Sequence, residues 1–142
     1  MPSSAAVHAL LQRNWHPEPG ASEEDVTNFE RELPFCLPDE YRSLLLASNG
    51  GEGPLTTSPL RLCLYDVAFA RDIWKDPFYR EQYGNYFFFG SSGGGDSIAI
   101  DISSGQAESI VTLDCIAGED SKEVIAPDFL CFLGNVGAEA GE

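Results

Sequence analysis

The sequence predicts an α+β domain: an N-terminal helical hairpin packed on an antiparallel β-meander sheet, with a closing C-terminal helix. Three observations predict this class. Two segments with helical apolar spacing come first, at residues 23–33 and 38–48. From Leu60 onward apolar residues alternate with polar ones, as in strands with one buried face. A helical pattern returns after Pro127. This order is typical of helices that cover one face of a sheet.

The chain begins with an N-terminal extension, residues 1–20, in which residues 3–14 have the spacing of a short helix. Its apolar face comprises Val7, Leu10 and Leu11. A turn-rich segment follows, and we expect Trp15 at its start to pack against the first helices.

The helical hairpin comes next. Ser22 is a good N-cap for the helix at 23–33, because its hydroxyl can accept a hydrogen bond from a backbone N–H of the first turn. Pro34 ends this helix. Its expected buried residues are Val26, Phe29 and Leu33.

The second helix of the hairpin begins at Pro38, whose fixed φ suits a first helical turn. Asp39 and Glu40 follow at the positive end of the helix dipole. Its expected buried face comprises Tyr41, Leu44, Leu45 and Ser48. Asn49 and the two glycines after it tolerate positive φ, so we expect them to stop the helix.

The apolar period then changes to that of a strand at residues 60–65. The expected core residues of this strand are Leu60, Leu62 and Leu64. Asp66 is placed to cap a short helix that reaches Trp74. Residues 75–85 (KDPFYREQYGN) are expected to form a polar, aromatic-rich loop.

Three strands are expected next, at 86–89, 97–102 and 109–113. The glycine turn GSSGGGD and the turn SSGQ join them into a meander. Pro127 then opens a last helix that Gly134 stops. Its expected inward residues are Phe129, Leu130, Phe132 and Leu133. The expected domains are thus the extension at 1–20, a single domain at 21–136 and a flexible tail at 137–142.

The net charge of the chain limits the kinds of macromolecule that it is expected to bind. The chain carries 23 acidic residues against 8 Lys and Arg, a net charge of −15. Residues 91–142 hold ten acids and one base, Lys122, a net charge of −9. Such a surface repels nucleic acid and anionic lipid and attracts basic proteins. The same excess of acid also favours plain solubility, so both interpretations of the charge stay open.

The apolar runs are far shorter than the about 20 residues that a membrane-spanning helix needs. The N-terminus has no basic residue before its apolar patch, as a signal peptide would. We therefore expect a cytoplasmic protein that does not bind membranes.

Patterns that would indicate a cofactor, a metal or catalysis are weak. The four cysteines lie far apart in apolar stretches, and neither His8 nor His16 stands at ligand spacing, so we expect buried free thiols and no metal. The glycine turn ends in an acid, Asp96, which suits a hairpin and not a phosphate site. Ser91 and Ser92 have no histidine nearby for a catalytic triad. We name no cofactor and no catalytic residue. An enzyme acting on carbohydrate or nucleotide would require a deep pocket of converging acids.

A partner-binding surface is predicted from two groups of residues. The acidic group lies in or beside the predicted strands: Asp96, Asp101, Asp114, Glu119 and Asp120. The aromatic group surrounds the predicted loop: Trp74, Phe78, Tyr79 and Tyr83. Trp and Tyr are enriched in interface hot spots, which favours a contact role. Two alternatives stay open: the acids keep strand edges from pairing, and the aromatics fill the core.

Three segments of the sequence resemble the SUKH superfamily. LPDEYRSLLLASNGGEG, preceded by SEEDVTNFERELPFC, resembles the family's acidic first helix followed by LP, an aromatic, a leucine run and NGG. YFFFGSSGGGDSIAIDISSGQAESIV resembles its central hairpin, and APDFLCFLGNV resembles its closing helix. The resemblance covers residues 21–134 and keeps the segments in the family's order.

The resemblance implies an α+β domain that binds other proteins and has no known catalytic centre. Family members include bacterial immunity proteins, which neutralise a toxin that is often a nuclease or deaminase, and fungal regulators of cell-wall synthesis. For this chain the expectation is a non-enzymatic immunity protein whose partner is a basic toxin domain. The alternative is a regulatory or scaffold protein of the fungal type without a toxin partner. The aromatic-rich segment before Tyr86 departs from the family pattern and leaves the partner's identity open.

Overall fold

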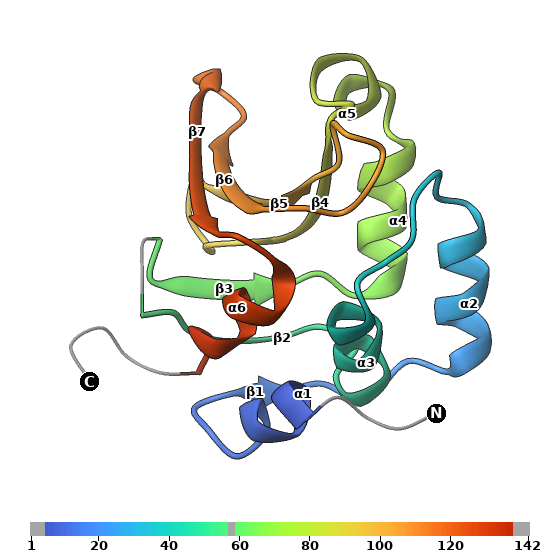
Figure 1. The fold of residues 1–142 in the computed structure, drawn as a ribbon, viewed down its shortest axis with the longest axis vertical. Coiled ribbons are helices and arrows are strands. Elements are labelled where there is room, and N and C mark those ends of the chain that lie inside the picture. Colours follow the sequence, from blue (N-terminus) through green and yellow to red (C-terminus); the bar gives the residue numbers. More distant parts are fainter. Residues whose placement is uncertain (1–4, 57–58, 138–142) are drawn as a thin grey trace.

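The computed structural model describes residues 5–56 and 59–137. Its helices are α1 (Ala5–Leu10), α2 (Glu23–Arg31), α3 (Asp39–Ala47), α4 (Val67–Lys75), α5 (Pro77–Gln82) and α6 (Phe129–Gly134) (Figure 1). Its strands are β1 (His16–Pro17), β2 (Gly51–Pro54), β3 (Arg61–Leu64), β4 (Tyr86–Ser91), β5 (Ser97–Asp101), β6 (Ile110–Asp114) and β7 (Gly118–Ala126). The predicted α+β class is confirmed.

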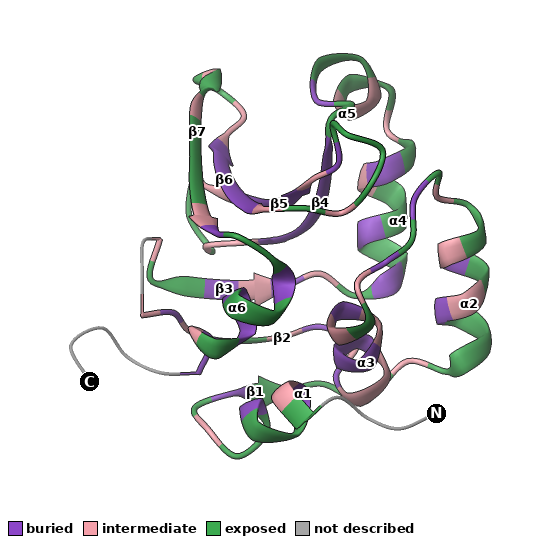
Figure 2. Cartoon of the chain, in the orientation of Figure 1, coloured by how far each residue is buried: buried purple, intermediate pink, exposed green. Residues whose placement is uncertain are grey.

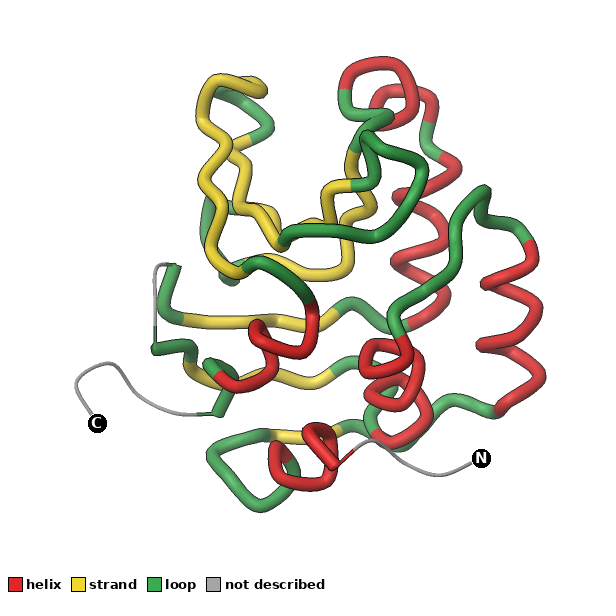
Figure 3. The backbone as a smooth tube through the Cα atoms, viewed as in Figure 1, coloured by secondary structure: helices red, strands yellow, loops and turns green. Residues whose placement is uncertain are grey.

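The described strands form one antiparallel sheet whose spatial order equals the chain order, β1 to β7. The predicted meander is therefore confirmed and extends from three strands to seven. Strands β4 to β7 curl into a trough (Figure 3), with β4 on one wall and β7 on the other. The helices cover the outer, convex face of this trough, and α5 lies near its opening (Figure 1).

The main hydrophobic core fills the space between the helices and the convex face of the sheet. Tyr41 on α3 sits at its centre, with ring centroids 5.7 Å from Phe87, 5.8 Å from Phe89 and 5.4 Å from Phe129. The four residues predicted for the buried face of this helix, Tyr41, Leu44, Leu45 and Ser48, are all buried. In the first helix of the hairpin, Val26 and Phe29 are buried as predicted, whereas Leu33 lies beyond the end of α2 and is half-buried.

The end of α3 is held by the residues predicted to stop it. Gly50 and Gly51 have φ of 108° and 109°, a conformation that side chains with a Cβ resist. A Cβ on Gly51 would lie 2.7 Å from the carbonyl oxygen of His16, so β1 approaches too closely for any other residue. The Ser48 hydroxyl accepts a hydrogen bond of 3.2 Å from the indole N–H of Trp15, which confirms that Trp15 packs against the helices.

A second, smaller core fills the concave face of the trough. It comprises Tyr83, Tyr86, Phe88, Ala99, Val111 and Leu113. Because β4, β5 and β6 have side chains packed on both faces, they are buried along most of their length, whereas β7 and α5 expose most of their residues (Figure 2). The sheet therefore separates two cores of different composition.

The predicted loop at 75–85 is wrong in part, because the structure places helix α5 within it. Asp76 caps this helix by accepting a hydrogen bond of 2.9 Å from the backbone N–H of Phe78, and Pro77 occupies its first turn. Both are helix-start signals. They are hard to recognise in the sequence because the helix has only six residues and no fully buried side chain.

Two predicted core residues are exposed. Leu60 has a positive φ of 72° and is 55% exposed, so it belongs to the turn before β3 and not to the strand. Leu130 is 52% exposed on α6, while its predicted partners Phe129, Phe132 and Leu133 are buried. The cysteines are free thiols, but Cys36 and Cys131 are exposed, which corrects their predicted burial. Both cysteines have apolar neighbours in the sequence, yet both are exposed, because Cys36 lies in the connection that leads into α3 and Cys131 lies on the side of α6 that faces solvent.

Three strands were absent from the predicted set, each for a physical reason. Strand β1 has two residues, too few for any alternation. Strand β2 (GEGP) consists of residues that usually break strands. Strand β7 (GEDSKEVIA) lies at the edge of the sheet with mostly exposed side chains, so it lacks the apolar alternation of a half-buried strand.

The N-terminal extension belongs to the same fold. Val7 and Leu10 of α1 are buried in the main core, and β1 pairs with β2. Leu11, predicted on the same face, is 36% exposed just beyond the helix. Gly137 donates a hydrogen bond of 2.8 Å to the carbonyl of Pro54, and the rest of the predicted tail, 138–142, lies outside the described residues. Within residues 5–56 and 59–137, no helix is long and apolar enough to cross a membrane.

Candidate functional site

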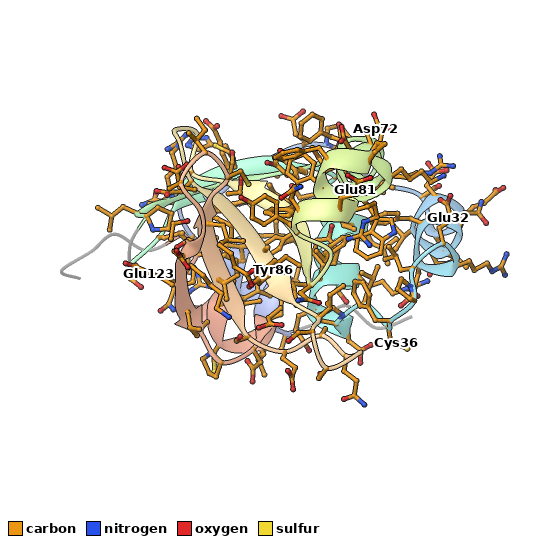
Figure 4. All side chains as sticks on the ribbon, turned by 90° about the horizontal axis from the view of Figure 1, so that it is seen from above. Glu32, Cys36, Asp72, Glu81, Tyr86 and Glu123 are labelled. Carbon is orange, nitrogen blue, oxygen red and sulfur yellow. The ribbon has the colours of Figure 1, made fainter. Side chains whose placement is uncertain are left out.

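The concave face of the sheet gathers most of the tyrosines. The chain has five, and four of them line or border the trough: Tyr65, Tyr79, Tyr83 and Tyr86. We call this group the tyrosine cluster. Viewed from above (Figure 4), Tyr86 lies over the middle of the sheet, between β7, which carries Glu123, and the α4–α5 region, which carries Asp72 and Glu81.

Tyr86 links the floor of the trough to its charged wall. Its hydroxyl donates a hydrogen bond of 2.6 Å to a carboxylate oxygen of Glu119. The ammonium of Lys122 lies 5.7 Å from the centre of the Tyr86 ring and 3.7 Å from a carboxylate oxygen of Asp101. Burial and then the hydrogen bond to Glu119 raise the pKa of Tyr86. The only base of the C-terminal third is therefore held inside the acidic face.

Tyr83 closes the trough from the side of α5. Its hydroxyl donates a hydrogen bond of 3.1 Å to the carbonyl of Cys115, which spans from the end of α5 to the end of β6. Its ring packs edge-on against Phe88, with centroids 6.0 Å apart. Tyr79 contacts the same Phe88 ring at 5.1 Å. The short helix α5 is thus attached to the sheet by aromatic side chains and serves as a lid on the second core.

Exposed residues surround this lid and the neighbouring β6–β7 turn. Ile116 at the tip of the turn is 100% exposed, and Phe78 on α5 is 51% exposed. Glu119 and Asp120 at the start of β7 are exposed carboxylates. We call Phe78, Ile116, Glu119 and Asp120 the rim. It combines apolar side chains with negative charge at the opening of the trough.

The β6–β7 turn is rigidly built. A carboxylate oxygen of Asp114 accepts hydrogen bonds from the backbone N–H groups of Ile116, at 2.9 Å, and Ala117, at 3.2 Å. The hydroxyl of Ser121 accepts a hydrogen bond of 2.8 Å from the N–H of Asp114 and donates one of 2.6 Å to the carbonyl of Gly118. These bonds order the turn, at whose tip the Ile116 side chain is fully exposed.

The predicted acids divide into two kinds. Asp101 and Asp114 are engaged within the chain: Asp101 accepts hydrogen bonds from the N–H of Ser103, at 2.9 Å, and from its hydroxyl, at 2.7 Å. Partial burial acts to raise the pKa of Asp101, but the bonds from Ser103 and the charge of Lys122 lower it overall. Asp120 and Glu119 are exposed at the rim, while Asp96 is half-buried at the glycine turn.

The predicted aromatics divide in the same way. Trp74 is buried in the main core, 5.9 Å from Phe35, and the Arg80 guanidinium lies 3.4 Å from the centre of its ring. Tyr83 is buried in the second core, and Tyr79 is half-buried. Only Phe78 of this group is largely exposed. Trp74 and Tyr83 therefore fill cores and support the surface instead of forming it.

Two residues that the sequence reasoning did not select contribute to this face. Ile116 follows Cys115 in LDCIAGED, two residues before Gly118, and a glycine between two strand-like segments indicates a turn. Tyr86 was assigned only to a strand, although its place at the first position of an aromatic run allows its hydroxyl to reach beyond the core.

In the described part of the chain, no group of three or more His, Cys, Asp or Glu side chains is arranged to hold a metal ion. Two acids lie at the tyrosine cluster: Glu119 accepts the hydrogen bond of the Tyr86 hydroxyl, and Asp101, whose pKa is lowered, pairs with Lys122 beside the Tyr86 ring.

The chain was compared with models of known protein families and with curated proteins. Residues 20–135 match the model of the SMI1 / KNR4 family (SUKH-1). This range contains every element from α2 to α6 and both groups of predicted site residues. No curated protein matches the chain.

Proposed function

The chain belongs to the SMI1 / KNR4 family (SUKH-1), a family of immunity-like and regulatory protein-binding modules, and from this premise we propose that its rim binds a basic protein partner. The most specific form of the proposal is a cytoplasmic, non-enzymatic immunity protein that neutralises a cognate toxin of the nuclease or deaminase type. The observation that carries it is the joint exposure of Ile116, Phe78, Glu119 and Asp120 around one opening of the fold.

The rim has the composition of a contact surface. A side chain as exposed as Ile116 gains nothing from folding, so it can contribute its full apolar area to a complex. The neighbouring carboxylates attract Lys and Arg over longer distances and orient the partner before contact. The net charge of −15 adds to this steering at low salt.

The rim is also held in place before binding. The Asp114 and Ser121 hydrogen bonds order the β6–β7 turn, and the Tyr83 bond to Cys115 ties α5 to it. A surface that is ordered in advance loses little conformational entropy on association. A toxin that holds nucleic acid with Lys and Arg would present complementary charge here, and binding would occlude those side chains.

A regulatory or scaffold role without a toxin is the alternative within the same family. Both roles use a protein-binding surface, so the rim alone does not separate them. The identity of the neighbouring gene does: a directly adjacent toxin gene favours immunity, and an isolated eukaryotic gene favours regulation.

The proposal is tested by binding to the purified toxin domain encoded next to this gene. Ile116→Glu and Asp120→Lys should each weaken binding at least tenfold, which corresponds to about 1.4 kcal/mol. Binding of the unaltered protein should weaken as salt rises from about 50 mM to about 500 mM, because exposed ion pairs are screened.

Matched controls change the same chemistry elsewhere. Leu60→Glu alters another exposed apolar residue at a strand end, and Glu24→Lys reverses another exposed acid, on α2. Both should bind like the unaltered protein. Equal affinity of all four variants would disprove the rim as the contact surface, and a toxin that binds no form of the protein would disprove the immunity role.

A further inference from the structure

A second surface, separate from the rim, is formed where three connections meet on the helical side of the molecule. A groove of about 630 Å³ lies between the α2–α3 connection, the β5–β6 connection and the start of α6. In Figure 4, Cys36 of the first connection lies beside the β5–β6 connection, far from Tyr86 and Glu123. None of the rim residues lines this groove.

The floor of the groove is apolar. Phe35 and Phe129 belong to the main core, yet both also line the groove, and Pro34, Pro38 and Ala107 form its walls. Leu130, which is 52% exposed, stands at its edge. Leu130 and Cys36 were both expected to be buried, but both are exposed, and both line this groove.

The charge of the groove has a single sign. Its lining includes the carboxylates of Glu40, Glu108 and Asp128 and no Lys, Arg or His among the described residues. Asp128 is partly engaged, because it accepts a hydrogen bond of 2.8 Å from the N–H of Cys131 at the start of α6. Glu40 and Glu108 remain to interact with a cation.

The walls also present backbone groups. In the described part of the chain, no intramolecular hydrogen bond involves the backbone of Phe35, Cys36, Gln106 or Ala107. Backbone N–H and C=O groups that have no partner in the chain are satisfied by water or by a ligand. Two facing stretches of such groups above an apolar floor suit an extended polypeptide, which has the same groups to pair.

We propose that this groove docks an extended segment of a protein partner that carries an apolar side chain next to Lys or Arg. The apolar side chain would rest on Phe35 and Phe129, and the cation would pair with Glu108, with the charge of Glu40 adding to the attraction. An anionic ligand such as a nucleotide would meet three carboxylates. A second copy of this chain would bring a further net charge of −15 and is disfavoured for that reason.

The Cys36 thiol offers a direct probe, because it is exposed and lines the groove. The experiment measures alkylation of each cysteine by mass spectrometry in the presence of a set of capped hexapeptides. One set has a central Leu or Phe flanked by Arg, and the other has the same centre flanked by Glu. Cys131 is exposed but does not line the groove, so it serves as the reference within the same molecule. Asp128 raises the pKa of the Cys131 thiol, so each thiol is compared with its own rate without peptide.

At about 1 mM peptide, where a site of millimolar affinity is half filled, members of the Arg set should slow alkylation of Cys36 at least twofold and leave Cys131 unchanged. Glu108→Lys should abolish the protection. Glu123→Lys, an exposed reversal on β7, should preserve it. Ile116→Glu should also preserve it, which separates this site from the rim.

Three results would overturn the proposal: no protection of Cys36 by any Arg peptide, equal protection by the Glu set, or protection that survives Glu108→Lys. None of these results bears on toxin binding by the rim, because the rim residues are absent from the groove. Loss of toxin binding in the rim variants would likewise leave the peptide result unchanged.

Discussion

The two faces of strand β4 differ in chemistry although they share one backbone. On the convex face, Phe87 and Phe89 pack into the main core beneath the helices. On the concave face, Tyr86 and Phe88 pack into the second core beneath α5. Among the described residues, helices α1, α2, α3, α4 and α6 contribute side chains to the main core, whereas the second core is covered mainly by α5, a helix of six residues.

This difference explains where phenylalanine and tyrosine are placed. A phenylalanine ring has no polar group to satisfy, so it suits a space that is closed on all sides. A tyrosine buries its ring while its hydroxyl reaches a partner near the surface. Tyr86 and Tyr83 do this with Glu119 and Cys115. The convex face therefore mainly stabilises the fold, and the concave face connects the fold to the rim.

The largest effect on the free energy of unfolding is expected when a phenylalanine side chain of β4 is truncated to alanine, first on one face and then on the other. Phe87 contacts the rings of Phe29, Phe35, Tyr41 and Trp74. Phe87→Ala should lower the free energy of unfolding by about 4 kcal/mol, within the range for buried phenylalanines. Phe88→Ala on the other face should cost less, about 3 kcal/mol, because its aromatic neighbours are Tyr79 and Tyr83 of the thin lid.

Urea unfolding measures both variants, and Phe78→Ala is the surface control. Phe78 is 51% exposed, with its ring 5.3 Å from that of Tyr79 and 6.0 Å from that of Tyr83, so its truncation should lower the free energy of unfolding by about 1 kcal/mol, clearly less than either core variant. A larger loss for Phe88→Ala than for Phe87→Ala would contradict the division of roles between the faces.

A loss of stability at high pH is the second expected effect, and it arises on the concave face. Burial, with the charges of Tyr79 and Cys115 when ionised, raises the pKa of Tyr65 to about 12, and burial also raises the pKa of Tyr79, Tyr83 and Tyr86. In the unfolded chain a tyrosine loses its proton near pH 10. The folded state therefore binds more protons above that pH, so the stabilisation is present below pH about 10 and is lost as the pH rises toward about 12.

Urea unfolding at increasing pH tests this expectation. Tyr86→Phe should make the decline above pH about 10 less steep, because one tyrosine with a raised pKa is gone. Lysine and cysteine titrations are common to both proteins and cancel in the comparison. An identical decline in both would show that Tyr86 does not contribute.

The smallest effect is expected from replacing a tyrosine by phenylalanine on each face. The two substitutions should change the free energy of unfolding in opposite directions. The hydroxyl of Tyr41 in the main core is buried and has no hydrogen-bond partner within the described residues. Tyr41→Phe should raise the free energy of unfolding by about 1 kcal/mol, because an unsatisfied buried hydroxyl is removed. Tyr86→Phe should lower it by about 1 kcal/mol, because the bond to Glu119 is lost. Urea unfolding at neutral pH compares them, and a decrease for both variants would refute the contrast.

Local signals predicted the elements that build the convex side. Ser22 and Asp66 cap the helices that they were expected to cap, with bonds to the N–H groups of Asp25 at 3.1 Å and Phe69 at 2.8 Å. Apolar residues predicted the three central strands, as an unbroken run at 86–89 and as alternation at 97–102, because the side chains of these strands are buried. The same signals failed for β7 and α5, whose residues are mostly exposed and therefore have no apolar period to recognise.

The candidate site was predictable only in part. The sequence showed an aromatic-rich segment around residues 74–89 and a net charge of −9 over residues 91–142, and the fold brings Phe78, Glu119 and Asp120 to one rim. It did not show that Trp74 is buried or that Asp101 and Asp114 hold turns and ion pairs within the chain. These roles depend on the direction of each side chain, which the curl of the sheet sets.

The sequence by itself determined the α+β class, the helical hairpin, the central strands and the family, because caps, glycines and apolar periods act between residues close in the chain. Only the tertiary structure decided which face of each strand became a core, which acids remained free, and where the groove beside Cys36 lies. Those outcomes follow from contacts between distant segments, such as Tyr83 with Cys115 and the α2–α3 connection with the β5–β6 connection. No local pattern encodes such contacts, since they depend on how the sheet bends and on what covers it.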